Sequence, residues 1–299
     1  MLLRPFHQFT TLLSVYPQLF RSFHELIVRV LGKSYSQTIV LSSHKREIMD
    51  SDNFSDDIRI NKRHWDEIAK RDNLRRVEFL SKIRDNCPYL EEMEPKISPY
   101  LQNIKGKKII IPQFGDGAVM LACVKRGAIV TGVDLSSEQV RLAREGAEYC
   151  GVSVTLVEAD WQHLPNSVPR NHFDLAVAEC GIFIWIRDLD AWMNNVYRVL
   201  KKNGRLVVTD FHPLSLITKQ ENGEARIKRS YFDQDHPINH LASEEDEPQS
   251  HEFLWKLSDI INASIKSGFK LNCLEEFHVE ESGIPPLIPS DFLLTATKE

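Results

Sequence analysis

Short, mostly apolar runs alternate with segments of helical periodicity over the last two thirds of the chain. The runs at 109–111, 129–133 and 173–178 are almost continuous in apolar residues, which is typical of strands buried on both faces of a parallel sheet. Strands alternating with helices at this spacing predict right-handed βαβ units and a doubly wound, mostly parallel α/β sheet. The predicted strands cover 108–111, 129–133, 152–157, 173–178, 205–209, 270–274 and 292–297, and the predicted helices cover 118–126, 137–149, 190–200 and 257–267.

The pattern divides the chain into three parts. Residues 1–48 begin with a basic, acid-poor amphipathic stretch, which is either a targeting peptide or a segment upstream of a natural start at Met49. Residues 49–102 have helical periodicity and form either a cap over a pocket or helices packed on the sheet edge. Residues 103–299 form the α/β domain, in which 213–256 is a long insertion of the kind that often serves as a lid over a substrate.

The turn after the first strand carries the clearest chemical signal. Gly115 and Gly117 allow the backbone to approach a ligand closely, and the helix that follows favours a negative group at its N-terminus. Asp134 ends the second strand about 20 residues later, where a carboxylate can accept hydrogen bonds from ribose hydroxyls. This combination predicts a cofactor that contains adenosine. A glycine turn that binds another ligand is the alternative.

Four segments, in order, resemble class I S-adenosylmethionine-dependent methyltransferases. They are the second-strand motif at 127–136, the acidic loop at 160–161, the fourth strand at 173–177 and the turn into strand five at 198–206. The resemblance implies a seven-stranded Rossmann-like methyltransferase sheet with its last strand antiparallel, and S-adenosyl-L-methionine as cofactor. It implies transfer of a methyl group to an oxygen, nitrogen or carbon atom of a small molecule.

The first motif departs from this family. Ile111 stands where the family has an acid that helps to hold the cationic end of the methionine moiety, and Gln113 replaces the first glycine. A bacterial branch of the family looks similar here and has the Trp-x-x-Asp-Leu pattern found at 185–189. The departure motivates one alternative, a catalytically inactive S-adenosylmethionine-binding protein. A second alternative, an NAD-linked oxidoreductase, is disfavoured by Met120, which occupies the third glycine position of the dinucleotide fingerprint.

Candidate site residues follow from the strand ends and the insertion. His212 and Glu179 are the candidate catalytic bases, although a structural hydrogen bond for His212 and a cofactor contact for Glu179 are the alternatives. The predicted cofactor contacts are Gln113, Gly115, Gly117, Asp134, Leu135, Asp160, Trp161 and Glu179. The predicted substrate contacts are Trp65, Trp185, Tyr231, His236, His240 and Trp255.

The composition limits which partners and which cellular compartment we expect for the protein. The net charge of -5 argues against a nucleic-acid partner, since phosphate binding usually needs a basic face. The five cysteines are scattered without metal spacing, so we expect neither a metal site nor disulfides, and a cytoplasmic location. No apolar run approaches the roughly 18 residues that span a membrane, so we expect no membrane partner. The expected partner is a small-molecule acceptor, and the oligomeric state is not indicated.

Overall fold

The structure is a computed structural model that describes residues 56–71, 73–85, 88–221, 224–233, 237–239, 241, 247–279 and 287–299. These residues belong to a single unit formed by Phe54–Glu280 and Ile284–Glu299. The extension predicted over residues 1–48 lies outside the described residues.

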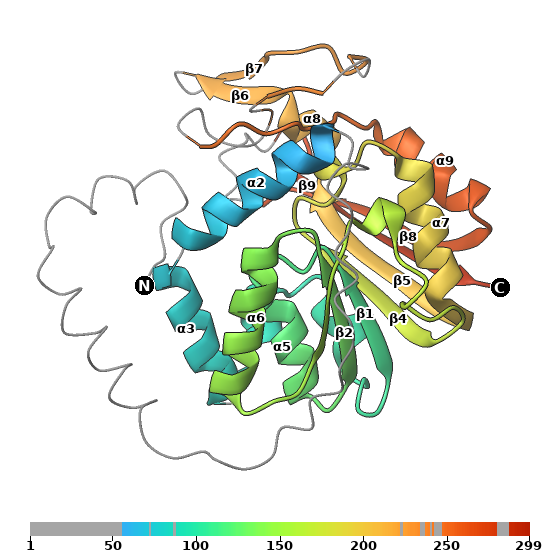
Figure 1. The fold of residues 1–299 in the computed structure, drawn as a ribbon. Coiled ribbons are helices and arrows are strands. Elements are labelled where there is room, and N and C mark those ends of the chain that lie inside the picture. Colours follow the sequence, from blue (N-terminus) through green and yellow to red (C-terminus); the bar gives the residue numbers. More distant parts are fainter. Residues whose placement is uncertain are drawn as a thin grey trace, which may run out of the picture. The chain divides into compact units, whose positions relative to one another are not determined.

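A seven-stranded sheet with the order β3-β2-β1-β4-β5-β9-β8 organises this unit (Figure 1). The five strands from β3 to β5 are parallel, and β9 is antiparallel to both of its neighbours. The doubly wound sheet with an antiparallel last strand is therefore confirmed. The strands are β1 (Lys108–Pro112), β2 (Ile129–Asp134), β3 (Thr155–Glu158), β4 (Phe173–Glu179), β5 (Leu200–Phe211), β8 (Phe269–Phe277) and β9 (Asp291–Lys298).

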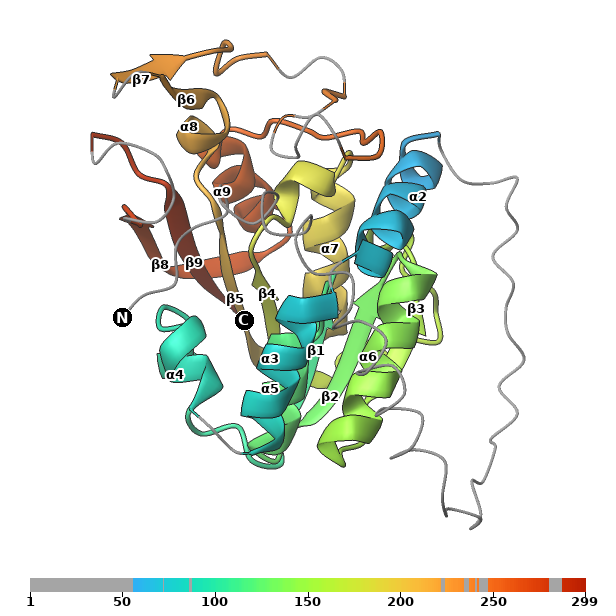
Figure 2. The same ribbon diagram turned by 90° about the vertical axis from the view of Figure 1, so that its left-hand side faces the viewer.

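Helices cover both faces of the sheet, as Figure 2 shows for α5 and α6 on one side and α7 and α9 on the other. Side chains alternate between the two faces along each strand. Ile109 and Ile111 accordingly join the core under α3, α5 and α6, whereas Ile110 joins the core under α7 and α9. The helices are α2 (Asp56–Arg71), α3 (Asn73–Arg84), α4 (Tyr89–Met93), α5 (Ala118–Lys125), α6 (Ser137–Cys150), α7 (Leu189–Val199), α8 (Pro213–Leu216) and α9 (Leu257–Lys266).

Short helical turns and a small ribbon complete the described elements. The 3-10 turns η3 (Ser98–Leu101), η4 (Trp161–His163) and η5 (Phe183–Trp185) connect larger elements, and β6 (Thr218–Glu221) pairs with β7 (Glu224–Ile227) as a separate ribbon. The ribbon and α8 lie within the insertion predicted at 213–256.

Local sequence explains where the central elements begin and end. Ser136 caps α6 because its side chain accepts a hydrogen bond of 3.1 Å from the Gln139 amide, and Gly151 ends the helix at a φ of 64°. The fifth strand starts earlier than predicted, at Leu200, but its pairing with β4 shifts register before it resumes at Arg205. The predicted turn is the cause, since Asn203 adopts a φ of 62° between these two residues.

Candidate functional site

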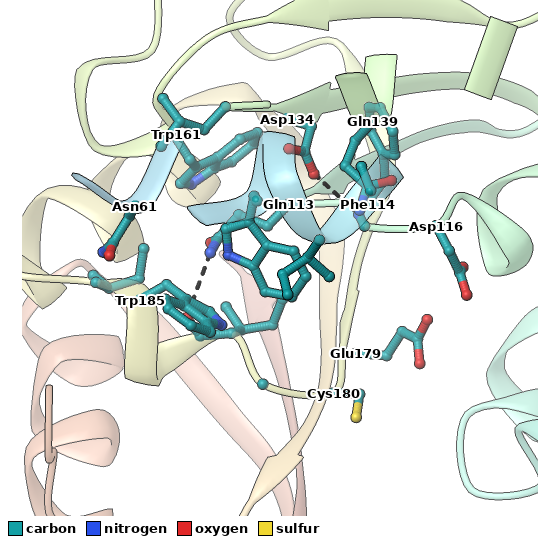
Figure 3. A pocket seen from close by; sticks show the side chains of 18 of the residues that line it. Asn61, Gln113, Phe114, Asp116, Asp134, Gln139, Trp161, Glu179, Cys180 and Trp185 are labelled. Carbon is teal, nitrogen blue, oxygen red and sulfur yellow. Dashed lines mark hydrogen bonds between the residues drawn. The ribbon is translucent and has the colours of Figure 1, made fainter. Parts of the chain in front are cut away.

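A cavity of about 300 Å³ lies at the carboxyl ends of β1, β2 and β4 (Figure 3). Ligands of open α/β sheets bind at this edge, where the strand order reverses. Here the order reverses between β1 and β4, the two central strands that end at the cavity. Helix α2 forms a further wall, to which it contributes Asp57, Ile58, Asn61, Trp65, Ile68 and Ala69.

The loop after β1 packs tightly against β2 and leaves open space above itself. A Cβ atom on Gly132 would lie 2.4 Å from Met120 Sδ and 2.7 Å from Phe114, so only glycine allows this approach. Gly115, at a φ of 54°, has no atom within 4 Å of an added Cβ, so the backbone there faces free space. The loop can therefore support a ligand laid directly over it.

Gln113 shapes the same loop from the first glycine position of the motif. Its φ of 52° is a left-handed conformation that costs a residue with a side chain free energy. The amide compensates, because Oε1 accepts from Trp192 Nε1 at 2.7 Å and Nε2 donates to the Ile182 carbonyl at 3.4 Å. Gln113 thus ties the first loop to α7 and to the loop after β4.

Asp134 presents a fixed carboxylate to the cavity. Its side chain accepts from the Gly115 amide at 3.0 Å and from the Ser136 amide at 2.9 Å. Burial raises the pKa of Asp134 to about 6, against the effect of these two N–H groups and of Lys62. The remaining lone pairs of its oxygens can accept hydrogen bonds from a pair of neighbouring hydroxyls.

The acidic loop after β3 is largely occupied by its own contacts. Asp160 caps η4 through a bond of 3.1 Å from the Gln162 amide, and His163 Nδ1 lies 2.5 Å from the second carboxylate oxygen. Trp161 is 2% exposed and donates to the Trp192 carbonyl at 3.2 Å. Both residues line the cavity, with Leu135 from the end of β2.

A buried carboxylate holds the loop that follows β4. Asp210, at the end of β5, accepts hydrogen bonds of 2.6–3.0 Å from the amides of Gly181, Ile182 and Phe183 and one of 2.7 Å from Phe211. Burial raises the pKa of Asp210 to about 6, while these four N–H groups act in the opposite direction. This Asp210 clamp holds Gly181 and Ile182, which line the cavity directly after Glu179 and Cys180.

Cys180 faces the cavity as a neutral thiol. Although the side chain is exposed at the cavity, desolvation by the surrounding protein, together with the charges of Glu179 and Asp210, raises its pKa well above the ordinary value for cysteine. Because the thiolate is the nucleophilic form, this environment disfavours a covalent role for Cys180.

The position of His212 does not support the predicted catalytic role. The residue is 2% exposed, does not line the cavity, and caps α8 by accepting from the Leu214 amide at Nδ1, at 3.1 Å. Its Nε2 lies 2.8 Å from Glu276 Oε1. Both ring nitrogens thus lie beside protein groups and away from the cavity lining, and the catalytic role of His212 stays a prediction.

The predicted substrate residues separate into two groups. Trp65 and Trp185 line the cavity. Tyr231 and Trp255 do not: the Tyr231 hydroxyl accepts from the Leu257 amide at 3.2 Å, and Trp255 Nε1 donates to the Ile186 carbonyl at 2.7 Å.

His236 and His240, the other two predicted substrate contacts, lie outside the described residues. Gly117, a predicted cofactor contact, does not line the cavity, and its amide donates to the Phe114 carbonyl at 2.9 Å. It closes the loop at a φ of 81°, and its predicted contact with the cofactor stays a prediction.

Sequence reasoning missed the contacts that hold α2 against the insertion. The Asn61 side chain donates to the His251 carbonyl and accepts from its amide, each at 2.7 Å, and Asp57 accepts from His251 Nδ1 at 2.7 Å. Asp57 also pairs with Arg187. These partners lie up to 194 residues apart in sequence, so no local signal could reveal them.

The described residues carry no sign of two other kinds of site. No group of three or more His, Cys, Asp or Glu side chains within the described ranges is arranged to hold a metal ion. Among the helices of the same ranges, none has the length and apolar character needed to cross a membrane.

Comparisons with known proteins identify the central segment. Residues 113–204 match a family described as a methyltransferase domain. An uncharacterized protein of Haemophilus influenzae is 27% identical over 175 residues, which cover 56% of this chain and 67% of that protein. Demethylmenaquinone methyltransferase of Thermus thermophilus is 38% identical over 99 residues, which cover 33% of this chain and 44% of the relative. The chain thus spans from less than half to two thirds of the length of these relatives.

A solved structure shares the fold. The crystal structure of an S-adenosylmethionine dependent methyltransferase from Mesorhizobium loti superposes with a TM-score of 0.54 and 23% sequence identity. The match covers 68% of this chain and 96% of that protein. At this level of identity, the likeness concerns the fold.

Proposed function

We propose that the protein transfers a methyl group from S-adenosylmethionine to an oxygen, nitrogen or carbon atom of a small molecule, because residues 113–204 match a methyltransferase domain family and the chain shares the fold of an S-adenosylmethionine dependent methyltransferase. The observation that carries the proposal is the buried Asp134 carboxylate beside the open Gly115 backbone. The scattered cysteines fit a reducing compartment such as the cytoplasm.

The residues at the cavity fit the adenosine part of this cofactor. Asp134 would accept hydrogen bonds from the two ribose hydroxyls, and the bonds from the Gly115 and Ser136 amides, which fix its orientation, support this role. Leu135, Asp160 and Trp161 line the neighbouring wall, where the family resemblance implies contact with adenine. Gln113 and Glu179 line the region between β1 and β4, where they would face the methionine part.

The cofactor, when bound, supplies an activated methyl group on a sulfonium. The chain then has to hold the acceptor atom in line with that methyl group and keep water away, and such alignment can contribute about 7–11 kcal/mol. Glu179, at the end of β4 and on the cavity wall, is the candidate base for an acceptor that loses a proton.

The named relatives and the cavity wall favour a small acceptor over a macromolecule. Two of the relatives are named as menaquinone or ubiquinone methyltransferases, and both act on small molecules by name. Trp65, Trp185 and the insertion give the cavity partly apolar walls.

The catalytically inactive alternative is motivated by the altered first motif. Ile111 is 2% exposed and packs in the core, so it offers no charge to the methionine end of the cofactor. Methyl turnover on any acceptor would exclude this alternative.

Calorimetric titration with S-adenosylmethionine and S-adenosylhomocysteine tests the proposal. We expect dissociation constants in the micromolar range for both ligands, and no heat of binding with NAD. Absence of binding at millimolar S-adenosylhomocysteine would refute the proposed cofactor. Incubation of the loaded protein with candidate acceptors should then release S-adenosylhomocysteine, which mass spectrometry can follow.

Cofactor affinity should fall with decreasing pH because of Asp134. Only its ionised form offers both oxygens as acceptors, and its raised pKa of about 6 means that protonation sets in just below neutrality. We expect S-adenosylhomocysteine to bind about tenfold more weakly at pH 5 than at pH 7. In Asp134→Asn, whose amide does not titrate, affinity should be lower at pH 7 and nearly independent of pH over this interval. A wild-type affinity that does not change would contradict the proposed role of the carboxylate.

A further inference from the structure

Two partly exposed tryptophans meet on one wall of the cavity. Trp65, from α2, and Trp185, from η5, lie edge to face with their ring centroids 5.1 Å apart. Trp161 also lines the cavity but is only 2% exposed, and Trp192 is 0% exposed. Trp65 and Trp185 therefore present aromatic surface to the cavity, and we call this pair the aromatic corner.

The aromatic corner is held rigidly from behind. His64 is 1% exposed, and its ring centroid lies 5.2 Å from Trp185 and 5.5 Å from Trp65. The Pro248 carbonyl oxygen lies 2.8 Å from His64 Nδ1, so this nitrogen carries the proton and donates. A ring fixed in this way keeps both indoles in place before a ligand arrives, which lowers the entropic cost of binding.

Polar side chains beside the corner are already bonded to one another. Asp57 contacts both Arg187 and His251, which balances its charge. Asn61 uses its amide on the His251 backbone. The cavity lining also includes the apolar side chains of Ile58, Ile182, Ile186 and Phe253. Because Asp57 is already paired with Arg187 and His251, it offers little attraction to a charged group placed beside the corner, which would lose its hydration.

The corner lies next to the strand end where methyl transfer would occur. A Cβ atom on Gly181 would lie 3.9 Å from Trp185 Nε1, and Gly181 follows Glu179 by two residues. Figure 3 shows Trp185 and Asn61 on one side of the site and Asp116 and Glu179 on the other. A ring seated in the corner would therefore lie between Trp185 and Glu179, the residue that ends β4.

We propose that the aromatic corner of Trp65 and Trp185 binds the acceptor, and that the acceptor is a flat, conjugated, uncharged ring system with its methyl-accepting atom on the ring edge. This inference rests on the proposed function. Stacked or edge-to-face contact with the two indoles provides the selectivity, because a saturated ring of equal size gains the apolar burial but lacks the aromatic interaction.

A matched pair of probes tests the inference by binding alone. The first probe is 2-naphthol, and the second is decahydro-2-naphthol, which has the same carbon skeleton and hydroxyl position but is puckered and saturated. Each is titrated by calorimetry into the wild-type protein, with and without saturating S-adenosylhomocysteine. We expect 2-naphthol to bind about tenfold more tightly than decahydro-2-naphthol, because only 2-naphthol can make aromatic contacts with the two indoles.

Substitutions then test whether the preference for 2-naphthol over decahydro-2-naphthol comes from the corner. Trp65→Leu and Trp185→Leu should each reduce this preference to about threefold, and the double variant should abolish it. Trp65→Phe and Trp185→Phe should keep most of it, which separates loss of the aromatic face from loosening of α2. Phe232→Leu is the control, because Phe232 is 76% exposed and does not line the cavity. It should leave the preference unchanged.

Two results would overturn the inference: equal affinity for both probes, including no binding of either, or a preference that survives in the double leucine variant. The S-adenosylhomocysteine titration separates this failure from failure of the proposed function. Cofactor binding without ring selectivity would leave the methyltransferase proposal standing. Ring selectivity that depends on the two tryptophans, without cofactor binding, would refute the methyltransferase proposal and leave the aromatic site.

Discussion

Replacing Asp134 with alanine is expected to weaken S-adenosylhomocysteine binding about a hundredfold. A hydrogen bond to a charged group contributes about 1.5–3 kcal/mol, and under the proposed function the carboxylate would accept from two ribose hydroxyls. The change also removes the acceptor for the Gly115 amide at 3.0 Å, so part of the loss comes from loosening of the first loop. Calorimetry at pH 7.5 measures the effect.

Glu158→Ala is the matched control for this substitution. Glu158 ends β3 directly opposite Asp134 in the sheet register, but it does not line the cavity and pairs with Lys62 at 3.3 Å. The substitution Glu158→Ala removes a negative charge from the same sheet edge. It should change the affinity for S-adenosylhomocysteine less than threefold, as expected for an exposed ion pair. Equal losses in the two variants would point to a general electrostatic effect, and an unchanged Asp134→Ala would place the cofactor elsewhere.

The sheet was predictable because its signals are local. Buried parallel strands such as Phe173–Glu179 are continuous apolar runs, and helix caps such as Ser136 lie directly before the residues they serve. Asp134 was predictable for the same reason, since spacing along one βαβ unit places it beside the first loop.

The remainder of the site depends on contacts between distant segments. The α2 wall of the cavity is held by contacts between Asn61 and His251, and the aromatic corner forms where Trp65 contacts Trp185. The sequence marked both tryptophans as candidates but could not indicate that they touch. The sequence likewise could not indicate that the His212 ring, a predicted base at a strand end, caps α8 where the chain turns.

The Asp210 clamp is a third case in which a contact between distant residues shapes the site. Asp210 is 3% exposed and is the acceptor for four backbone N–H groups, three of which belong to the loop that carries the cavity wall after β4. This loop starts with Cys180 and Gly181, both at positive φ, so it needs external bonds to keep its shape. The sequence alone offers only an acid at the end of a strand.

Asp210→Ala is therefore expected to lower the free energy of unfolding by about 3 kcal/mol or more, because each buried N–H group left without an acceptor costs about 1–3 kcal/mol. Loss of a buried charge offsets part of this cost. Urea denaturation at pH 7 measures the difference. Asp210→Asn, which keeps one acceptor oxygen, should fall between wild type and alanine. Asp56→Ala, at a side chain that is 82% exposed, should change stability by less than about 1 kcal/mol.

In Asp210→Ala, the loop after β4 should lose its ability to bind 2-naphthol under conditions in which the protein is still folded. Trp185 follows the clamped residues within the same segment, so a loosened loop disorders the aromatic corner while Asp134 and the first loop stay in place. Under native conditions we expect Asp210→Ala to lose the preference for 2-naphthol and to keep S-adenosylhomocysteine affinity within about threefold of wild type. Loss of both ligands in parallel would mean that the two halves of the cavity are coupled through Gln113, which bonds to the Ile182 carbonyl of the clamped loop.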